Sequence, residues 1–177
     1  MIKRTAKTSP PSSARLFEES HASPPAGVHV ANIDGASRGN PGPAAYAVVL
    51  HGPHAAKLCE FAKVIGRETN NIAEYYGLIA ALDYAVSQGI RALRVRSDSE
   101  LLVRQMQGRY KVKNAALKPL HERAQKLARA LDYFVIEHVM REQNRDADAL
   151  ANVALDRGGS IGGSVRTGPA SGAAAST

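Results

Sequence analysis

The order of strand-like and helical segments is the feature of this sequence that most restricts its fold. Strands are predicted at 28–33, 44–51, 56–65, 91–97 and 133–140, and helices at 70–88, 99–107, 115–131 and 145–156. The short, glycine- and proline-containing connections predict antiparallel pairing of the first three strands. The helical crossovers that follow predict parallel addition of the last two strands to the same sheet. The chain is therefore predicted to be an α/β protein with a five-stranded mixed sheet, in the order βββαβααβα, and helices packed on it.

The predicted elements divide the chain into one domain and two tails. Residues 28–156 contain all of the strand and helix patterns. Residues 1–27 are rich in Pro, Ser and Ala without periodicity, and residues 157–177 are mostly Gly, Ser, Ala and Thr. Neither segment has enough large apolar residues to form a core, so both are predicted to be disordered tails.

Charge and cysteine content restrict the class of protein. The net charge is +7 and the sequence pI is about 9.8, which favours a polyanionic partner such as nucleic acid. The single cysteine, Cys59, excludes a disulfide framework within one chain and suits a reducing, cytoplasmic location. No apolar stretch approaches the roughly 18 residues of a membrane span, so no membrane association is expected.

Four acidic residues stand at or near the ends of predicted elements. Asp34 follows the first strand, Glu74 lies in the first turns of the longest helix, Asp98 ends a strand, and Asp148 lies just inside the last helix. The inferred topology places the strands that end at Asp34 and Asp98 beside each other, and sites in α/β sheets form at strand ends. Clustered carboxylates repel one another unless a hard cation neutralises them. Oxygen donors without His or Cys suit Mg²⁺ or Mn²⁺ rather than zinc.

Each of these acids alone also has an ordinary structural explanation. Asp34 fits a turn residue, Glu74 the third position of a capping box that starts at Asn71, Asp98 a helix cap, and Asp148 a favourable charge near a helix N-terminus. The combination of all four favours a common site over four separate structural roles.

Four motifs in the same order resemble the ribonuclease H type I family. They are Asp34-Gly-Ala-Ser-Arg-Gly-Asn-Pro-Gly-Pro43, Thr69-Asn-Asn-Ile-Ala-Glu74, Ser97-Asp98-Ser99 and Asn144-x-x-x-Asp148-x-Leu-Ala-Asn152. The resemblance covers about residues 28–156 and implies the ribonuclease H-like fold. It looks closest to the reverse-transcriptase-like branch found in archaea and many bacteria, because of Gly108-Arg-Tyr-Lys-Val-Lys-Asn114 and Val139-Met-Arg-Glu-Gln-Asn144.

The resemblance implies an endoribonuclease that cuts the RNA strand of RNA/DNA hybrids with two Mg²⁺ ions, with Mn²⁺ as a possible substitute. Asp34 would bridge both metals, Glu74 and Asp98 would hold the metal at the leaving oxygen, and Asp148 the metal that activates water. The products would carry 3′-hydroxyl and 5′-phosphate ends. Arg141, seven residues before Asp148, is preferred over His138 as the residue that helps product leave.

Substrate contacts are expected from a hairpin, a helix start and a basic segment. Gly39, Asn40, Pro41 and Gly42 form a turn whose backbone can approach a sugar closely, because its glycines have no side chain. By resemblance, Asn40 and Thr69 belong to a phosphate pocket and Asn70 and Asn71 contact the minor groove, although the two asparagines also suit helix capping. The remaining expected contacts are Ser99, Lys111 and Lys113, with the lysines bound to phosphates.

Three alternatives follow from the same residues. A nuclease of the same fold that also or mainly cuts RNA/RNA duplexes remains open, as does a non-catalytic nucleic-acid-binding module. A nucleotide-binding α/β protein is rejected, because the glycine-rich segment Gly35 to Gly42 leads into a strand and not into a helix. The protein is expected to act as a monomer.

Overall fold

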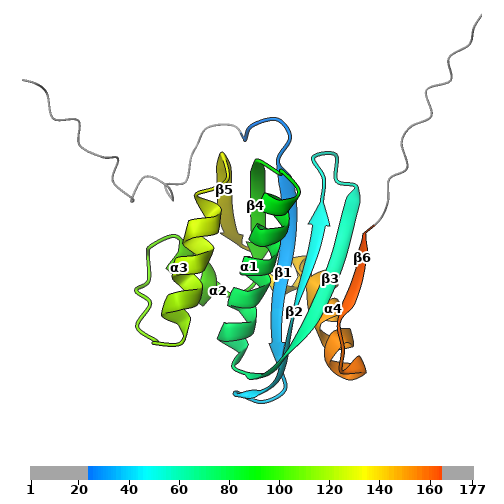
Figure 1. Ribbon diagram of the computed structural model, residues 1–177, viewed down its shortest axis with the longest axis vertical. Helices are drawn as coiled ribbons and strands as arrows, with labels where there is room; N and C mark the ends of the chain where they lie inside the picture. Colours follow the sequence, from blue (N-terminus) through cyan, green and yellow to red (C-terminus); the bar gives the residue numbers. More distant parts are fainter. Residues whose placement is uncertain (1–23, 165–177) are drawn as a thin grey trace, which may run out of the picture.

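The structure, a computed structural model, describes residues 24–164, which form a mixed sheet with helices on both faces (Figure 1). The strands are β1 (His29–Ser37), β2 (Gly42–His51), β3 (Lys57–Glu68), β4 (Ala92–Ser97), β5 (Tyr133–His138) and β6 (Ile161–Ser164). The helices are α1 (Asn70–Ser87), α2 (Glu100–Met106), α3 (Leu117–Ala128) and α4 (Arg145–Arg157), with a short 3-10 helix at Arg141–Gln143. Among the described helices, none has the length and apolar character that a membrane span requires.

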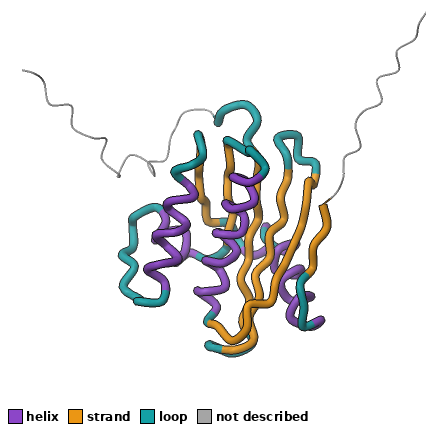
Figure 2. Tube along the Cα trace, viewed as in Figure 1, coloured by secondary structure: helices purple, strands orange, loops and turns teal. Residues whose placement is uncertain are grey.

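The sheet has the order β5-β4-β1-β2-β3-β6. Strands β1, β2, β3 and β6 pair in antiparallel fashion, whereas β4 and β5 add to β1 in parallel. Both directions of pairing agree with the prediction from connection length. The tube in Figure 2 shows the strands side by side, with helices on each side of the sheet.

Strand β2 shows why both faces of the sheet are covered. Its residues alternate, with Ala45 and Ala47 in one buried cluster and Val48 and Leu50 in the other. Successive side chains of a strand point to opposite faces, so a strand that is buried on both sides carries apolar residues at nearly every position. The sheet is therefore enclosed between α1 and α3 on one face and α4 on the other.

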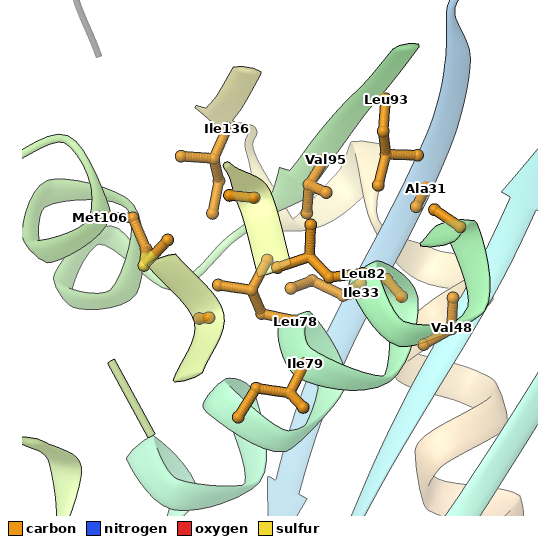
Figure 3. Packing of buried hydrophobic residues seen from close by; sticks show 14 of the residues in the cluster. Ala31, Ile33, Val48, Leu78, Ile79, Leu82, Leu93, Val95, Met106 and Ile136 are labelled. Atoms are coloured by element: carbon orange, nitrogen blue, oxygen red, sulfur yellow. The ribbon is translucent and has the colours of Figure 1, made fainter. Parts of the chain in front are cut away.

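The larger core lies under helix α1. Leu78, Ile79 and Leu82 of this helix gather with Ile33, Val48, Leu93 and Val95 of the sheet, as Figure 3 shows. Val48 and Ile33 lie on neighbouring strands, so the helix rests across the centre of the sheet. Burial of this face fixes α1 against β1, which matters because Glu74 is carried on α1.

The opposite face depends on small side chains. Helix α4 buries Ala147, Ala151 and Ala154, which recur at helical spacing, and the last two pack with Ala45, Ala47 and Ala62 of β2 and β3. Alanine on both sides allows the helix to approach the sheet closely. Asp148 follows Ala147 directly and is thereby held near the middle of the sheet.

The structure corrects two details of the predicted elements. The sheet has six strands and not five, because Ile161–Ser164 pairs with β3 inside the segment predicted as the second tail. Four residues rich in glycine carry almost no strand signal, and their pairing depends on the neighbouring edge of β3. Residues 1–23 and 165–177, the larger part of both predicted tails, lie outside the described residues.

The second correction concerns Asp34, which does not end the first strand. Strand β1 continues to Ser37 because it stays paired with β2 as far as the pair Ser37 and Ala44. Its parallel pairing with β4 stops earlier, at Asn32 and Arg96. Asp34 therefore lies inside a strand, just beyond the point where one of its two neighbours has ended.

Candidate active site

The first two carboxylates come from neighbouring parallel strands. Asp34 lies in β1 and is only 5% exposed, while Asp98 follows the last residue of β4 and is half-buried. The sequence predicted that these strands are neighbours, and their parallel pairing confirms it. Strand β4 ends at Ser97, whereas β1 continues to Ser37. Asp98 therefore lies just beyond the end of β4, next to Asp34.

Helix α1 brings the third carboxylate, Glu74, to the same place. Glu74 is 3% exposed, and the backbone N–H of Gly35 and the hydroxyl of Ser97 both donate hydrogen bonds to its carboxylate. The Ser97 hydroxyl also accepts a hydrogen bond from the backbone N–H of Ser99 at 3.1 Å. One oxygen of Glu74, Oε2, is buried and has no hydrogen-bond partner among the described residues.

One carboxylate oxygen from each of Asp34, Glu74 and Asp98 lies within 4.8 Å of the other two. Burial, together with the charges of Asp98 and Asp148, raises the pKa of Asp34 from 3.8 to about 8. Burial and the charges of Asp34 and Asp98 likewise raise the pKa of Glu74 well above its usual value. The cluster resists holding several negative charges at once, which is the electrostatic condition that a bound cation relieves.

Asp148 completes the site from the other face of the sheet. It is half-buried, and its Oδ1 lies 3.4 Å from Nη2 of Arg141 and 3.3 Å from Nδ2 of Asn152. The Asn152 amide also donates to the backbone carbonyl of Asp148 at 2.9 Å. Asp148 lies outside the 4.8 Å cluster, but its charge raises the pKa of Asp34, so the two carboxylates interact.

All four acids line one open pocket of about 340 Å³. The other residues around it are Gly35, Ala36, Ser37, Asn70, Ser99, Arg141 and Asn152. The buried, unpartnered oxygen of Glu74 and the purely carboxylate donor set fit a hard divalent cation that takes oxygen ligands. This cluster can therefore hold a metal ion.

The expected substrate residues fall into two groups in space. Asn40 accepts a hydrogen bond from the backbone N–H of Asn70 at 3.2 Å, which joins the hairpin of Gly39, Pro41 and Gly42 to the start of α1. Lys111 and Lys113 are exposed in the segment between α2 and α3 and do not line the pocket. The hairpin, the helix start and the carboxylates form one group, and the two lysines stand apart from it.

Helix capping belongs to residues other than those that the sequence suggested. The Thr69 side chain caps α1 by accepting a hydrogen bond from the backbone N–H of Ile72, so the capping interpretation of Asn70 and Asn71 is wrong. Ser99 caps α2 in the same way, by accepting from the backbone N–H of Leu102, so Asp98 is not its cap. Asn71, which is exposed, and Asp98 therefore do not have the capping roles that offered an alternative to function.

Arg141 and His138 occupy different positions relative to the pocket. Arg141 lines it and approaches Asp148, whereas His138 does not line it and places Nε2 3.2 Å from the backbone oxygen of Asp98. Of the two residues, only Arg141 lies beside the carboxylates in the pocket.

Three residues that contact the acids had no role in the sequence interpretation. Ser97 contacts Glu74, Asn152 contacts Asp148, and the buried Asn144 reaches Asp98. The spacing of the two asparagines, four residues before and four after Asp148, was the signal in the last motif that could have found them, since such positions share one side of a helix.

Fold and site together define an α/β protein with a carboxylate cluster of the kind that binds divalent metals. Residues 32–154 match the sequence model of the family described as reverse transcriptase-like. The solved structure of ribonuclease H1 from Halobacterium salinarum superposes with a TM-score of 0.72 at 44% identity, covering 74% of this chain and 99% of that one. The chain belongs to the type I ribonuclease H family, and the predicted ribonuclease H-like fold is confirmed.

Two further proteins resemble this chain over most of its described residues. A bifunctional protein of Mycobacterium tuberculosis is 51% identical over 128 residues, which are 72% of this chain and 35% of that protein. This chain therefore spans about a third of the length of that mycobacterial relative. LC11 ribonuclease H1, isolated from compost, was solved in complex with an RNA/DNA hybrid and is 40% identical, with a TM-score of 0.69 over 73% of this chain and 98% of that one.

Proposed function

We propose that the protein is an endoribonuclease that hydrolyses the RNA strand of RNA/DNA hybrids. The observation that carries this proposal is the convergence of one oxygen each from Asp34, Glu74 and Asp98 within 4.8 Å, in a pocket that Asp148 also lines. Membership of the type I ribonuclease H family and the hybrid complex of LC11 ribonuclease H1 support the choice of substrate.

The carboxylates would hold two divalent ions, Mg²⁺ or, in its place, Mn²⁺. Asp34, Glu74 and Asp98 are proposed to hold one ion, and Asp34 with Asp148 a second. When bound, these ions supply the positive charge that the transferred phosphate and the leaving oxygen need. In the reaction, a water oxygen bonds to phosphorus and the bond from phosphorus to O3′ breaks. The departing O3′ takes a proton, which leaves 3′-hydroxyl and 5′-phosphate ends.

The chain's own residues shape this site before any ion binds. The hydrogen bonds from Gly35 and Ser97 fix one part of the Glu74 carboxylate and leave Oε2 free as a ligand. Arg141 stands beside Asp148 with a side chain that is 75% exposed. An exposed cation next to a proposed metal ligand suits a role in product release, which we assign to Arg141.

Recognition of the RNA strand is proposed for the hairpin and the helix start beside it. The backbone of Gly39, Asn40, Pro41 and Gly42 can approach a 2′-hydroxyl, the group that distinguishes RNA from DNA. The Asn40–Asn70 hydrogen bond fixes this hairpin to α1. Thr69, Asn71 and Ser99 border the same region, and Lys111 and Lys113 would contact phosphates further along the duplex.

The proposal also covers the oligomeric state, a second substrate and the cellular location of the protein. All four carboxylates come from one chain, which supports a monomer as the active form. Because the site reads a sugar and a backbone, an RNA/RNA duplex is a second possible substrate. A cytoplasmic location fits a substrate that forms where nucleic acid is copied.

The test is cleavage of an end-labelled RNA/DNA hybrid in Mg²⁺ or Mn²⁺, beside RNA/RNA, DNA/DNA and single-stranded RNA. The expected result is metal-dependent cutting of RNA in the hybrid, with 3′-hydroxyl ends and no cutting of DNA/DNA. Asp148→Asn is expected to abolish cutting, since it removes a proposed ligand without removing core volume.

A matched control is Asp146→Asn on the same helix. Asp146 is exposed and does not line the pocket of the four acids, so this variant should cut at close to the wild-type rate. Folded protein that binds the hybrid but cuts no substrate with any metal would overturn the proposal and favour a non-catalytic binding module.

A further inference from the structure

Asn144 is a fully buried polar residue at the junction of three site elements. It is 1% exposed and lies between the 3-10 helix and the first residue of α4. Asparagine is among the preferred N-cap residues of helices, and Asn144 occupies that position. Its side chain nevertheless makes no capping hydrogen bond to α4, so it serves something other than the helix.

The side chain instead reaches across to strand β1 and to Asp98. Its Nδ2 donates to the backbone carbonyl of Ile33 at 2.8 Å and lies 3.5 Å from Oδ1 of Asp98. Its Oδ1 accepts from Nδ2 of Asn32 at 3.1 Å. A buried amide with both donors and its acceptor engaged is held in one orientation.

The same residue is joined through its backbone to the fourth carboxylate. The carbonyl of Asn144 accepts a hydrogen bond from the backbone N–H of Asp148 at 3.1 Å. One residue thus connects the peptide unit directly before Asp34, the carboxylate of Asp98, and the helix turn that carries Asp148. These three acids come from different elements, so Asn144 ties together parts of the site that the chain itself does not join.

Resting on the proposed function, we infer that Asn144 is a positioning residue that sets the spacing between the carboxylates that hold the metal ions. Its amide fixes the orientation of one Asp98 oxygen and prevents α4 from moving away from β1. Groups that orient metal ligands without touching the metal govern affinity, because a ligand that must be reoriented binds less tightly. Asn144 therefore acts through Asp98 and Asp148 and not on the substrate.

The test compares Asn144→Ala with Asn32→Ala. Asn32→Ala removes the hydrogen bonds from Asn32 to the Asn144 side chain at 3.1 Å and to the Gln143 carbonyl at 3.4 Å, but it touches neither Asp98 nor the Ile33 carbonyl. It therefore weakens the attachment of the same segment to β1 without removing a contact with an acid. Three quantities are measured for both: the thermal midpoint, Mn²⁺ binding by calorimetry without nucleic acid, and kcat and KM on the hybrid as Mg²⁺ is varied. Asn144→Ser, whose hydroxyl is too short to span to Asp98, serves if the alanine variant does not fold.

For Asn144→Ala or Asn144→Ser, the expected result is Mn²⁺ binding or kcat at limiting Mg²⁺ lowered by about 10- to 100-fold, with KM for the hybrid within about twofold of wild type. Asn32→Ala should lower the thermal midpoint while leaving the metal response close to wild type. If both positions change only the thermal midpoint, Asn144 has a structural role alone and the inference is overturned. Mn²⁺ binding is read without nucleic acid, so a failure of the hydrolytic function would show separately, as wild-type protein that binds metal and cuts nothing.

Discussion

The backbone of Gly35 in β1 touches the backbone of Glu74 in α1. A Cβ atom added at Gly35 would lie 2.2 Å from the backbone nitrogen of Glu74 and 2.5 Å from the carbonyl carbon of Ala73, closer than real Cβ contacts come. Gly35 does not have a positive φ, so glycine is needed here for space and not for conformation. This contact sets Asp34 and Glu74 side by side, and it depends on a missing side chain.

Gly35→Ala is therefore expected to push α1 away from β1. The atoms that the new Cβ would meet belong to the backbone of α1, which cannot move aside as the end of a flexible side chain can. We expect the free energy of unfolding to fall by about 1–3 kcal/mol or more, as for other overpacked sites, and cleavage to fall at least about tenfold. Chemical denaturation and hybrid cleavage measure the two effects. Gly159→Ala is the control, because a Cβ there meets nothing within 4 Å; equal behaviour of the two variants would contradict the packing argument.

The raised pKa of Asp34 predicts how the stability of metal-free protein depends on pH. This carboxyl has a pKa of about 8 in the folded protein, against 3.8 as its ordinary value, so between these two the folded state binds more protons than the unfolded state. Stability therefore falls as pH rises from about 4 to about 8, because unfolding becomes easier once the buried carboxyl must ionise. Thermal midpoints in EDTA from about pH 5 to about pH 9 measure the slope.

Two controls isolate this effect. Asp34→Asn should flatten the decline, since the neutral amide cannot ionise, and it should also abolish cleavage. Added Mg²⁺ should reverse the decline in the wild type, because a bound cation stabilises the ionised carboxylates of the folded state. A midpoint that rises with pH in EDTA would show that Asp34 ionises easily in the folded protein.

Arg141→Ala is expected to lower turnover more than substrate binding. The guanidinium stands 3.4 Å from Asp148 on a side chain that is 75% exposed, so its loss should leave the thermal midpoint unchanged. If it assists product release, kcat should fall by about tenfold while KM changes by less than about threefold, the split expected when an interaction acts after binding. Steady-state and single-turnover cleavage of the hybrid separate the two steps.

Arg145→Ala is the matched control for charge, since Arg145 is exposed at the first position of α4, four residues after Arg141, and does not line the pocket. It should keep the wild-type kcat. His138→Ala tests the competing assignment; a loss of kcat with this variant and not with Arg141→Ala would transfer the role to His138.

Much of this architecture could be predicted from the sequence because the signals were local. Turn residues between the first three strands and helical periodicity after them determine strand direction, and the order of the four acids along the chain indicated a common site. The neighbouring positions of β1 and β4, which put Asp34 beside Asp98, followed from connection rules alone.

The features that the sequence did not predict depend on interactions between distant parts of the chain. β1 extends past Asp34 because β2 pairs with it, and β6 forms because the edge of β3 accepts it; neither partner can be read from the segment itself. The contacts of Asn144 with Ile33 and Asp98 span 111 and 46 residues. A buried amide of this kind has no periodic pattern, so only the folded arrangement shows what it contacts.

The exposed lysines between α2 and α3 give the last prediction. Lys111 and Lys113 stand outside the pocket of the carboxylates, so they should affect how tightly the duplex is held and not how fast a bound duplex is cut. In the variant Lys111→Gln with Lys113→Gln, the slope of log affinity against log salt should become shallower by about 2, because each lysine would neutralise one phosphate, with kcat unchanged. Lys57→Gln is the control, because that lysine is already paired with Glu60 at 2.7 Å at the start of β3.

If the salt slope of the double variant equals that of the control, Lys111 and Lys113 make no phosphate contacts. A fall in kcat of the double variant would instead place these two lysines close to the site of cleavage.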